Sequence, residues 1–153
     1  MTKILFICHG NICRSPMAEF VMKDLVKKKG ISHLFEIDSA ATSTEEIGNP
    51  IYPPALACLQ SHGIVDAQHE ARQFTLGDYD YYDYLIIMDK NNLRNIRRII
   101  PTDFENKISL LMSFAGKDNH EVADPWYTGD FEITYRDVLA GCKGLLKHLS
   151  ASK

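Results

Sequence analysis

The sequence lacks any apolar stretch long enough to cross a membrane. Its longest apolar runs, Ile4 to Cys8 and Leu85 to Met88, are far shorter than a membrane-spanning helix. No cleavage site of small residues follows the first run, so we expect neither membrane insertion nor a signal peptide. Without a secretory signal, the predicted location is cytoplasmic.

Strong charge of either sign is also missing. The chain has 17 Lys and Arg against 20 Asp and Glu, a formal net charge of −3. This weak acidic balance produces no field that would attract polyanions, and it argues against general nucleic-acid binding. The 153 residues contain no repeat, linker or low-complexity tract, and 45% of them are hydrophobic. These properties predict one domain over residues 1–153.

Cysteine is present at four positions, but a chain long enough to bury a proper core does not need disulfides, and no secretory signal is present. Each thiol is therefore expected to serve packing or chemistry. Cys58 and Cys142 fall on apolar helical patterns, and we expect both in the core.

Buried-strand patterns alternate with amphipathic helical patterns along the whole chain, which predicts a doubly wound α/β fold. Ser15 and Pro16 are typical of a helix N-cap and first helical position. The tyrosine-rich stretch before the third strand is interpreted as the entry to that strand. Strands are expected at 3–8, 35–38, 84–88 and 108–112, and helices at 15–29, 55–62, 91–100 and about 131–149.

The turn after the first strand carries the main chemical signal. It reads Cys8-His-Gly-Asn-Ile-Cys-Arg-Ser-Pro16 and joins a buried strand to a helix N-terminus. Gly10 and Asn11 are residue types that tolerate positive φ, so successive N–H groups can point into one concavity. The turn is therefore predicted to cradle an anion the size of phosphate.

Two side chains in this turn suggest what happens to the anion. Arg14, expected at the rim, offers paired planar donors that suit two phosphoryl oxygens. Cys8, at the strand end, faces the same N–H array, which favours the thiolate and makes Cys8 a candidate nucleophile. The alternative is that Cys8 and Cys13 are core residues and Arg14 lies on the surface.

The segment resembles the low molecular weight protein tyrosine phosphatases, whose signature is Cys, five residues, Arg and Ser. The similarity extends over nearly the whole chain and includes Asp38-Ser39-Ala40, Ala71-Arg72-Gln73, Met88-Asp89 and Asp124-Pro125. The resemblance implies a four-stranded parallel sheet with helices on both faces and the phosphate-binding loop after the first strand. That loop comprises His9, Gly10, Asn11, Ile12, Cys13 and Ser15, between Cys8 and the helix.

The family implies hydrolysis of phosphotyrosine and small aryl phosphates through a phosphocysteine intermediate on Cys8. It also implies that no metal or cofactor takes part. The partners that the resemblance implies are a phosphotyrosine protein or peptide, inorganic phosphate as the product, and an opposing tyrosine kinase.

The reaction needs a proton donor for the leaving oxygen, and Asp124 is the best candidate. Pro125 follows it, and Trp126 and Tyr127 supply rings that could form a wall of the substrate pocket. The alternative for Asp124 is an ordinary Asp-Pro turn. Members of the family commonly carry an aromatic wall residue where this chain has Glu45 or Glu46. One side of the pocket is therefore expected to be open or acidic.

The resemblance assigns supporting roles to further residues. Ser39 and His69 would hold Asn11, and Ser15 would hydrogen-bond the Cys8 thiolate. Sequence alone favours an ordinary imidazole for His69. His120 and Asp124 form a loose pair without a second pair of ligands, so no metal site is predicted.

Cys13 lies in the same loop as Cys8 and is predicted to capture an oxidised Cys8 as a reversible disulfide. Among rival enzymes, an arsenate reductase needs two further cysteines in the middle of the chain, and residues 63–141 contain none. Protein-arginine phosphatases carry threonine where this chain has Ile12. A phosphopeptide-binding module without turnover is the non-enzymatic alternative.

Overall fold

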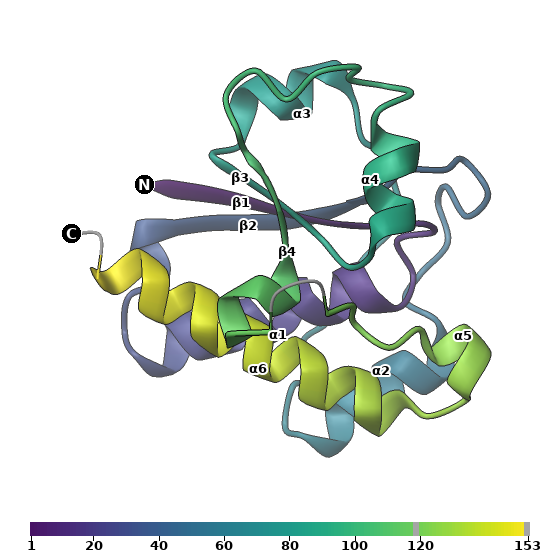
Figure 1. The fold of residues 1–153 in the computed structure, drawn as a ribbon. Helices are drawn as coiled ribbons and strands as arrows, with labels where there is room; N and C mark the ends of the chain where they lie inside the picture. The colour runs from purple at the N-terminus through teal and green to yellow at the C-terminus, as the bar shows by residue number, and fades with distance from the viewer. Residues whose placement is uncertain (118–119, 152–153) are drawn as a thin grey trace.

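A computed structural model describes residues 1–117 and 120–151. It contains four strands, six α-helices and two short 3-10 helices in these residues (Figure 1). The elements are β1 Thr2–Cys8, α1 Arg14–Lys28, η1 Ser32–Leu34, β2 Phe35–Ala41, α2 Pro53–Ser61, α3 Leu76–Tyr81, β3 Tyr84–Ile87, α4 Lys90–Ile96, β4 Ile108–Leu110, η2 Leu111–Ala115, α5 Pro125–Thr128 and α6 Phe131–Ala151.

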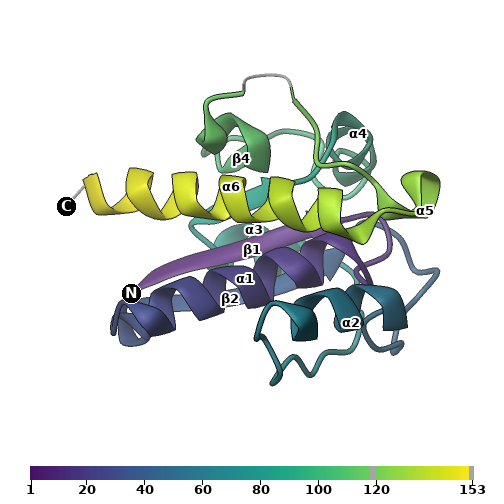
Figure 2. The same cartoon turned by 90° about the horizontal axis from the view of Figure 1, so that it is seen from below.

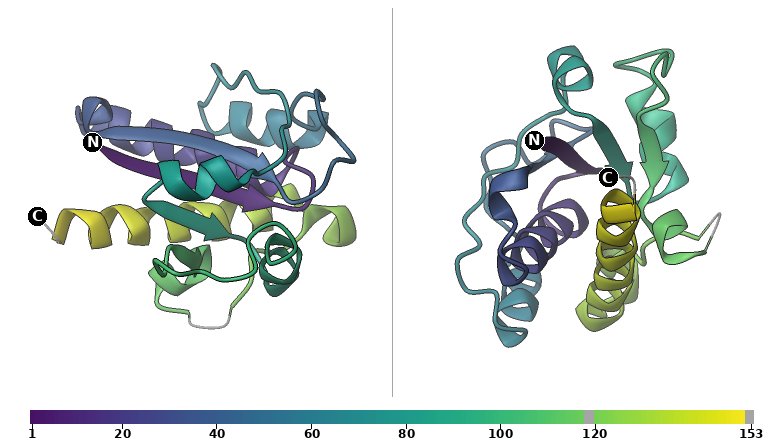
Figure 3. Two further views of the ribbon diagram at one scale, coloured as in Figure 1. Left: turned by 90° about the horizontal axis from the view of Figure 1, so that it is seen from above. Right: turned by 90° about the vertical axis from the view of Figure 1, so that its left-hand side faces the viewer.

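The strands form a parallel sheet in the order β2-β1-β3-β4. Helices α1 and α6 cover one face and α3 and α4 the other, as the views in Figures 1 and 3 show. Helices α1 and α6 pack against each other on their face of the sheet, which Figure 2 shows from below. The doubly wound α/β fold expected from the sequence is confirmed.

Strand β1 is apolar from Ile4 to Cys8 because both of its faces are buried there. Ile4 and Phe6 pack into the core under α1 and α6, whereas Leu5 and Ile7 pack into the core under α3 and α4. The strand has β2 on one side and β3 on the other, so the chain order reverses beside it. Ligands of open α/β sheets bind at the carboxyl ends of strands at such a reversal.

Several predicted boundaries are wrong. Strand β2 continues past Asp38 to Ala41, because Ala41 pairs with Cys8 of β1 and forms a bridge with Gln73 on its other side. Helix α1 begins at Arg14 with Cys13 as its N-cap, and no side chain caps it. Ser15 is therefore inside the first turn, which leaves its hydroxyl available to the preceding loop.

The tyrosine-rich stretch is only partly the entry to a strand, because Tyr79 and Tyr81 lie in α3 and Tyr84 begins β3. Thr75 and Asp78 form a reciprocal capping box that starts α3. Tyr79 and Tyr82 are buried under the sheet, whereas Tyr81 is exposed. The tyrosine spacing shows which rings face the core, but the capping residues decide that the backbone is helical.

Three later segments also differ from the prediction. Helix α4 ends at Ile96 rather than Ile100, and β4 ends at Leu110 before the 3-10 helix η2. The predicted loop at Asp124 contains one helical turn, α5. Across the described residues, no helix combines the length and the apolar character that a membrane span requires.

Glycines in α6 let η2 approach that helix closely. A Cβ at Gly144 would overlap the backbone carbonyl of Phe114. We expect Gly144→Ala to lower the free energy of unfolding by about 1–3 kcal/mol, because backbone cannot yield as a flexible side chain does. Denaturant unfolding of both proteins measures the difference.

Gly77→Ala in α3 is the matched control. A Cβ there lies 3.6 Å from the Thr75 hydroxyl oxygen, an ordinary contact. Its unfolding midpoint should stay close to that of the parent protein. If both variants unfold at the parent midpoint, the close packing of η2 against α6 does not contribute to stability.

Candidate active site

The loop between β1 and α1 is held by a left-handed backbone at Asn11, which has φ 60. Of the two residues expected to tolerate positive φ, only Asn11 uses it; Gly10 does not. Asn11 is completely buried. Asparagine is one of the few residue types that adopt this conformation at little cost, so the sequence and the turn are compatible.

The Cys8 sulfur lies at the base of this loop and is almost fully buried. Its Sγ is 3.0 Å from the Ser15 hydroxyl oxygen, and the Asn11 backbone N–H donates to it at 3.3 Å. Two polar groups that can donate hydrogen bonds therefore converge on one sulfur atom.

Every polar group of the Asn11 side chain has a partner. Its amide nitrogen donates to the Ser15 and Ser39 hydroxyl oxygens at 2.8 and 2.9 Å. Its amide oxygen accepts from the Arg72 backbone N–H at 3.2 Å. The His69 Nε2 donates to the Asn11 backbone carbonyl at 2.9 Å. The structure thus brings Ser15, Ser39 and His69 together around the residue that shapes the loop.

Glu19 lies behind this group, and sequence reasoning missed it. The Ser39 hydroxyl donates to its carboxylate at 2.6 Å, and Lys23 contacts the other carboxylate oxygen at 2.6 Å. The second nitrogen of His69 is 3.8 Å from the same carboxylate. Ser15 and Glu19 are four residues apart on α1, a spacing that puts both on one helix face and could have revealed the link.

Arg14 is buried rather than exposed at the rim, which corrects the expected position. Its guanidinium donates to the Val122 carbonyl at 3.1 Å and pairs with Asp89 at 2.8 Å. A second carboxylate, that of Asp124, is 3.5 Å away. Burial lowers the pKa of Arg14, but Cys8, Asp89 and Asp124 together raise it above its ordinary value.

Asp89 also was not recognised as a site residue. It caps α4, where its carboxylate accepts from the Asn92 backbone N–H at 2.8 Å. It directly follows the apolar run of β3, and β3 is adjacent to β1. The rule that places sites at the carboxyl ends of parallel strands would have indicated it.

Asp124 approaches the loop from a distant part of the chain. One carboxylate oxygen accepts from the Trp126 backbone N–H at 3.0 Å and caps α5. The other faces Arg14 at 3.5 Å. Its side chain is 31% exposed, so it contacts both solvent and the buried guanidinium.

Cys8, Arg14, Asp89 and Asp124 line one open cleft with a volume of about 760 Å³. Trp126 and Tyr127 stand exposed at one side, and the Trp126 ring contacts Tyr52 with centroids 5.1 Å apart. On the loop side, the His9 ring lies 2.9 Å from the Glu45 carboxylate. The lining comprises residues from the loop, from the two glutamates, from the start of α4 and from the segment around Asp124: Cys8, His9, Gly10, Asn11, Ile12, Cys13, Arg14, Glu45, Glu46, Asp89, Asn91, Asn92, Asn95, Glu121, Val122, Ala123, Asp124, Trp126 and Tyr127.

All four cysteines are free and buried. Cys13 lines the same cleft as Cys8; burial, then the charge of Cys8, raises its pKa to about 12. Cys58 and Cys142 belong to the core, as expected. His120 and Asp124 are not part of the group of potential metal ligands found in the described residues, which is Cys58, His62 and Glu132.

Three comparisons with known proteins point to the same family. The family model described as low molecular weight phosphotyrosine protein phosphatase matches residues 3–153. The low molecular weight phosphotyrosine protein phosphatase of Rattus norvegicus is 43% identical over 148 residues, which covers 94% of this chain and 93% of the relative.

Solved structures agree. The low molecular weight protein-tyrosine-phosphatase YfkJ of Bacillus subtilis is 37% identical over 154 residues, 100% of this chain and 99% of the relative. Its crystal structure superposes with a TM-score of 0.93 and covers 100% of this chain and 97% of that one. The drosophila arginine phosphatase DARP superposes with a TM-score of 0.86 at 29% identity, covering 97% and 98% of the two chains. This chain belongs to the low molecular weight phosphotyrosine protein phosphatase family.

Proposed function

We propose that this protein hydrolyses phosphotyrosine in proteins and peptides, and small aryl phosphates, through a phosphocysteine intermediate on Cys8. The observation that carries the proposal is the Cys8 sulfur, which accepts from the Asn11 N–H, lies 3.0 Å from the Ser15 hydroxyl oxygen and shares one cleft with Arg14 and Asp124. A nucleophile, an anion-binding site and an acid then face one reacting phosphorus atom.

In the first step, loop N–H groups and the Arg14 guanidinium bind the phosphoryl oxygens. Asp89 and the Val122 carbonyl orient the guanidinium. The Cys8 sulfur attacks phosphorus, a sulfur–phosphorus bond forms, and the bond to the phenolic oxygen breaks. Asp124 gives its proton to that leaving oxygen.

In the second step, water attacks the phosphocysteine. The Asp124 carboxylate takes a proton from that water, and inorganic phosphate leaves as the sulfur–phosphorus bond breaks. The Ser15 hydroxyl, 3.0 Å from Sγ, donates to the departing thiolate and stabilises it. Ser39 and His69 act as positioning residues, because they contact Asn11 and not the sulfur.

The cleft walls indicate the substrate class. Ile12, Trp126 and Tyr127 provide apolar surface for an aromatic ring, and Ile12 replaces the threonine of protein-arginine phosphatases. Glu45 and Glu46 line the cleft where relatives commonly have an aromatic residue. An acidic rim disfavours acidic residues beside the phosphotyrosine. A cytoplasmic location and an opposing tyrosine kinase are part of the same proposal.

Two rival functions are less well supported. An arsenate reductase needs two further cysteines for the nucleophile. Cys13 lines the cleft beside Cys8, but Cys58 and Cys142 are buried in the core and do not line it. A phosphopeptide-binding module would need no proton donor. In this cleft the Asp124 carboxylate lies 3.5 Å from Arg14, beside the place where the phosphoryl group would bind, which suits a proton donor. Arginine phosphatase activity stays the nearest alternative, since DARP shares the fold.

The first test is hydrolysis of an aryl phosphate, with phosphoarginine and with arsenate plus reductant assayed in parallel. We expect the aryl phosphate to be preferred, and Cys8→Ser to lower its turnover on the order of 10⁴-fold or more. Calorimetry should still detect phosphate binding by Cys8→Ser, because the N–H loop and Arg14 remain. Preference for phosphoarginine, or a turnover of Cys8→Ser close to that of the parent protein, would refute the proposal.

The second test concerns the acid. Asp124→Ala should lose on the order of 10²–10⁴ in kcat for an aryl phosphate with a poor leaving group, and much less for an acidic phenol. Asp124→Asn is the matched variant, since its amide oxygen can still cap α5 but it supplies no acidic proton. Full activity in Asp124→Asn, or equal losses for both substrates, would make Asp124 a structural residue only.

The third test concerns Cys13. Burial raises the pKa of Cys13 to about 12, which keeps it a neutral and less reactive thiol. In this proposal peroxide therefore oxidises the nucleophile Cys8 to a sulfenic acid. The Cys13 thiol then attacks that sulfur, the disulfide forms and water leaves. We expect peroxide inactivation to be reversed by a thiol reductant, and recovery to be weaker in Cys13→Ser than in the control Cys58→Ser. Equal recovery in both variants would leave Cys13 with a packing role.

A further inference from the structure

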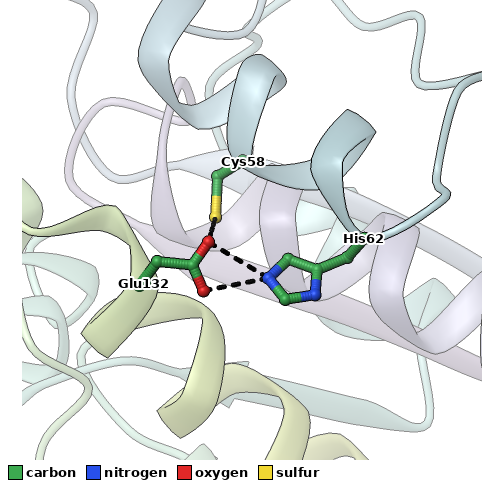
Figure 4. A group of neighbouring side chains, drawn as sticks. All are labelled: Cys58, His62 and Glu132. Carbon is green, nitrogen blue, oxygen red and sulfur yellow. Dashed lines mark hydrogen bonds and ion pairs between the residues drawn. The ribbon is translucent and has the colours of Figure 1, made fainter.

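We propose that Cys58, His62 and Glu132 form a binding site for a divalent transition-metal ion of the zinc type, which links α2 to α6. The three side chains converge from two helices, as Figure 4 shows. Thiolate, imidazole and carboxylate are the ligands that zinc takes in proteins. None of the three residues lines the catalytic cleft.

The donor atoms already lie at nearly the separations that zinc requires. Cys58 Sγ is 3.5 Å from one Glu132 oxygen, and His62 Nε2 is 3.1 and 2.9 Å from the two oxygens (Figure 4). All three ligand atoms lie within 4.8 Å of one another. Tetrahedral zinc, with bonds of about 2.0–2.3 Å, separates its ligands by roughly 3.4–3.6 Å. Small side-chain rotations are therefore enough to admit the ion.

The helices fix these positions. Cys58 lies in α2 and His62 is the C-cap residue of that helix, four residues later. Both side chains are turned toward Glu132 of α6. Glu132 is in the first turn of α6. The His62 ring stacks on Tyr135 with centroids 3.7 Å apart and an interplanar angle of 6°, which holds the imidazole in place.

The three residues differ in exposure, and the exposed ones leave the cluster open to a metal ion from solvent. Cys58 is buried, and its sulfur contacts the Phe131 carbonyl oxygen at 3.6 Å. The His62 and Glu132 side chains are 34% and 54% exposed. An ion can therefore reach the cluster from solvent, and water can occupy a fourth coordination position.

The charges balance on binding. A thiolate, a carboxylate and a neutral imidazole carry two negative charges, which a divalent ion neutralises. The metal–sulfur bond forms as the Cys58 thiol proton leaves to solvent. Asp130 adds negative potential near Cys58, and Arg136 opposes it near Glu132. Without metal, the His62–Glu132 contact and the Cys58–Glu132 hydrogen bond hold the same side chains together.

The rings of Phe131 and Tyr52 connect the cluster to the catalytic cleft. Phe131, next to Glu132, stacks on Tyr52 with centroids 6.1 Å apart, and Tyr52 contacts Trp126 at the cleft. The Tyr52 N–H donates to the Ile12 carbonyl in the phosphate loop at 2.9 Å. An ion that links α2 to α6 would therefore restrict the motion of α2 and of its N-cap residue Tyr52, which contacts Trp126 in the cleft wall.

The experiment titrates the full-length, metal-stripped protein with Co²⁺, which absorbs through a thiolate-to-cobalt charge-transfer band when cysteine binds it. We expect saturation at one equivalent, and displacement by one equivalent of Zn²⁺. The band should be lost in Cys58→Ser and retained in Cys8→Ser, which separates this site from the thiol of the cleft. A band that survives Cys58→Ser, or that disappears in Cys8→Ser, would overturn the proposal, as would the absence of a band.

Two further variants keep the test independent of Cys58. Glu132 is exposed, so Glu132→Gln should fold and bind Zn²⁺ at least about 10-fold more weakly. His33→Gln changes an exposed histidine of η1 outside the cluster and should bind as the parent does. Zn²⁺ at a hundredfold excess over Kd should raise the parent Tm by roughly 5–10 °C. Equal Zn²⁺ affinity in the parent and Glu132→Gln would show that the cluster is only hydrogen-bonded.

Discussion

The left-handed backbone of Asn11, with φ 60, is the constraint on which the site depends. With this backbone conformation, the N–H of Asn11 points at the Cys8 sulfur and donates to it at 3.3 Å. A buried asparagine holds this shape because Ser15, Ser39, Arg72 and His69 satisfy its amide and its carbonyl. An unsatisfied amide at the same depth would cost about 1–3 kcal/mol, so the surrounding donors and acceptors stabilise the loop as a unit.

Charged residues surround this hydrogen-bond network and hold its members in place. Glu19 accepts from Ser39 and pairs with Lys23, so a buried carboxylate supports the hydroxyl that supports Asn11. On the other side of the loop, Arg14 is buried between Asp89 and Asp124. In the proposed reaction, carboxylates that hold a cationic group at this depth orient it before the phosphoryl group binds, which lowers the entropy cost of binding.

Hydrophobic periodicity predicted the fold class well, because the central strands β1 and β3 are buried on both faces and α6 buries one apolar face. It failed where a local cap decided the backbone. Thr75 and Asp78 made a helix from a tyrosine-rich stretch that had the composition of a strand. It also failed at Ala41, because that residue belongs to β2 only through its pairing with Cys8 and Gln73.

By itself the sequence determined the strand, the loop and the helix that carry Cys8, Asn11 and Arg14, because these residues are contiguous and their turn chemistry is local. It also indicated Asp124, Ser39 and His69, through resemblance to a family. Only the tertiary structure showed that Glu19 and Asp89 join the site and that Glu132 meets Cys58 and His62. The physical reason is that these contacts connect separate elements, and their distances depend on how helices pack across the sheet and against each other.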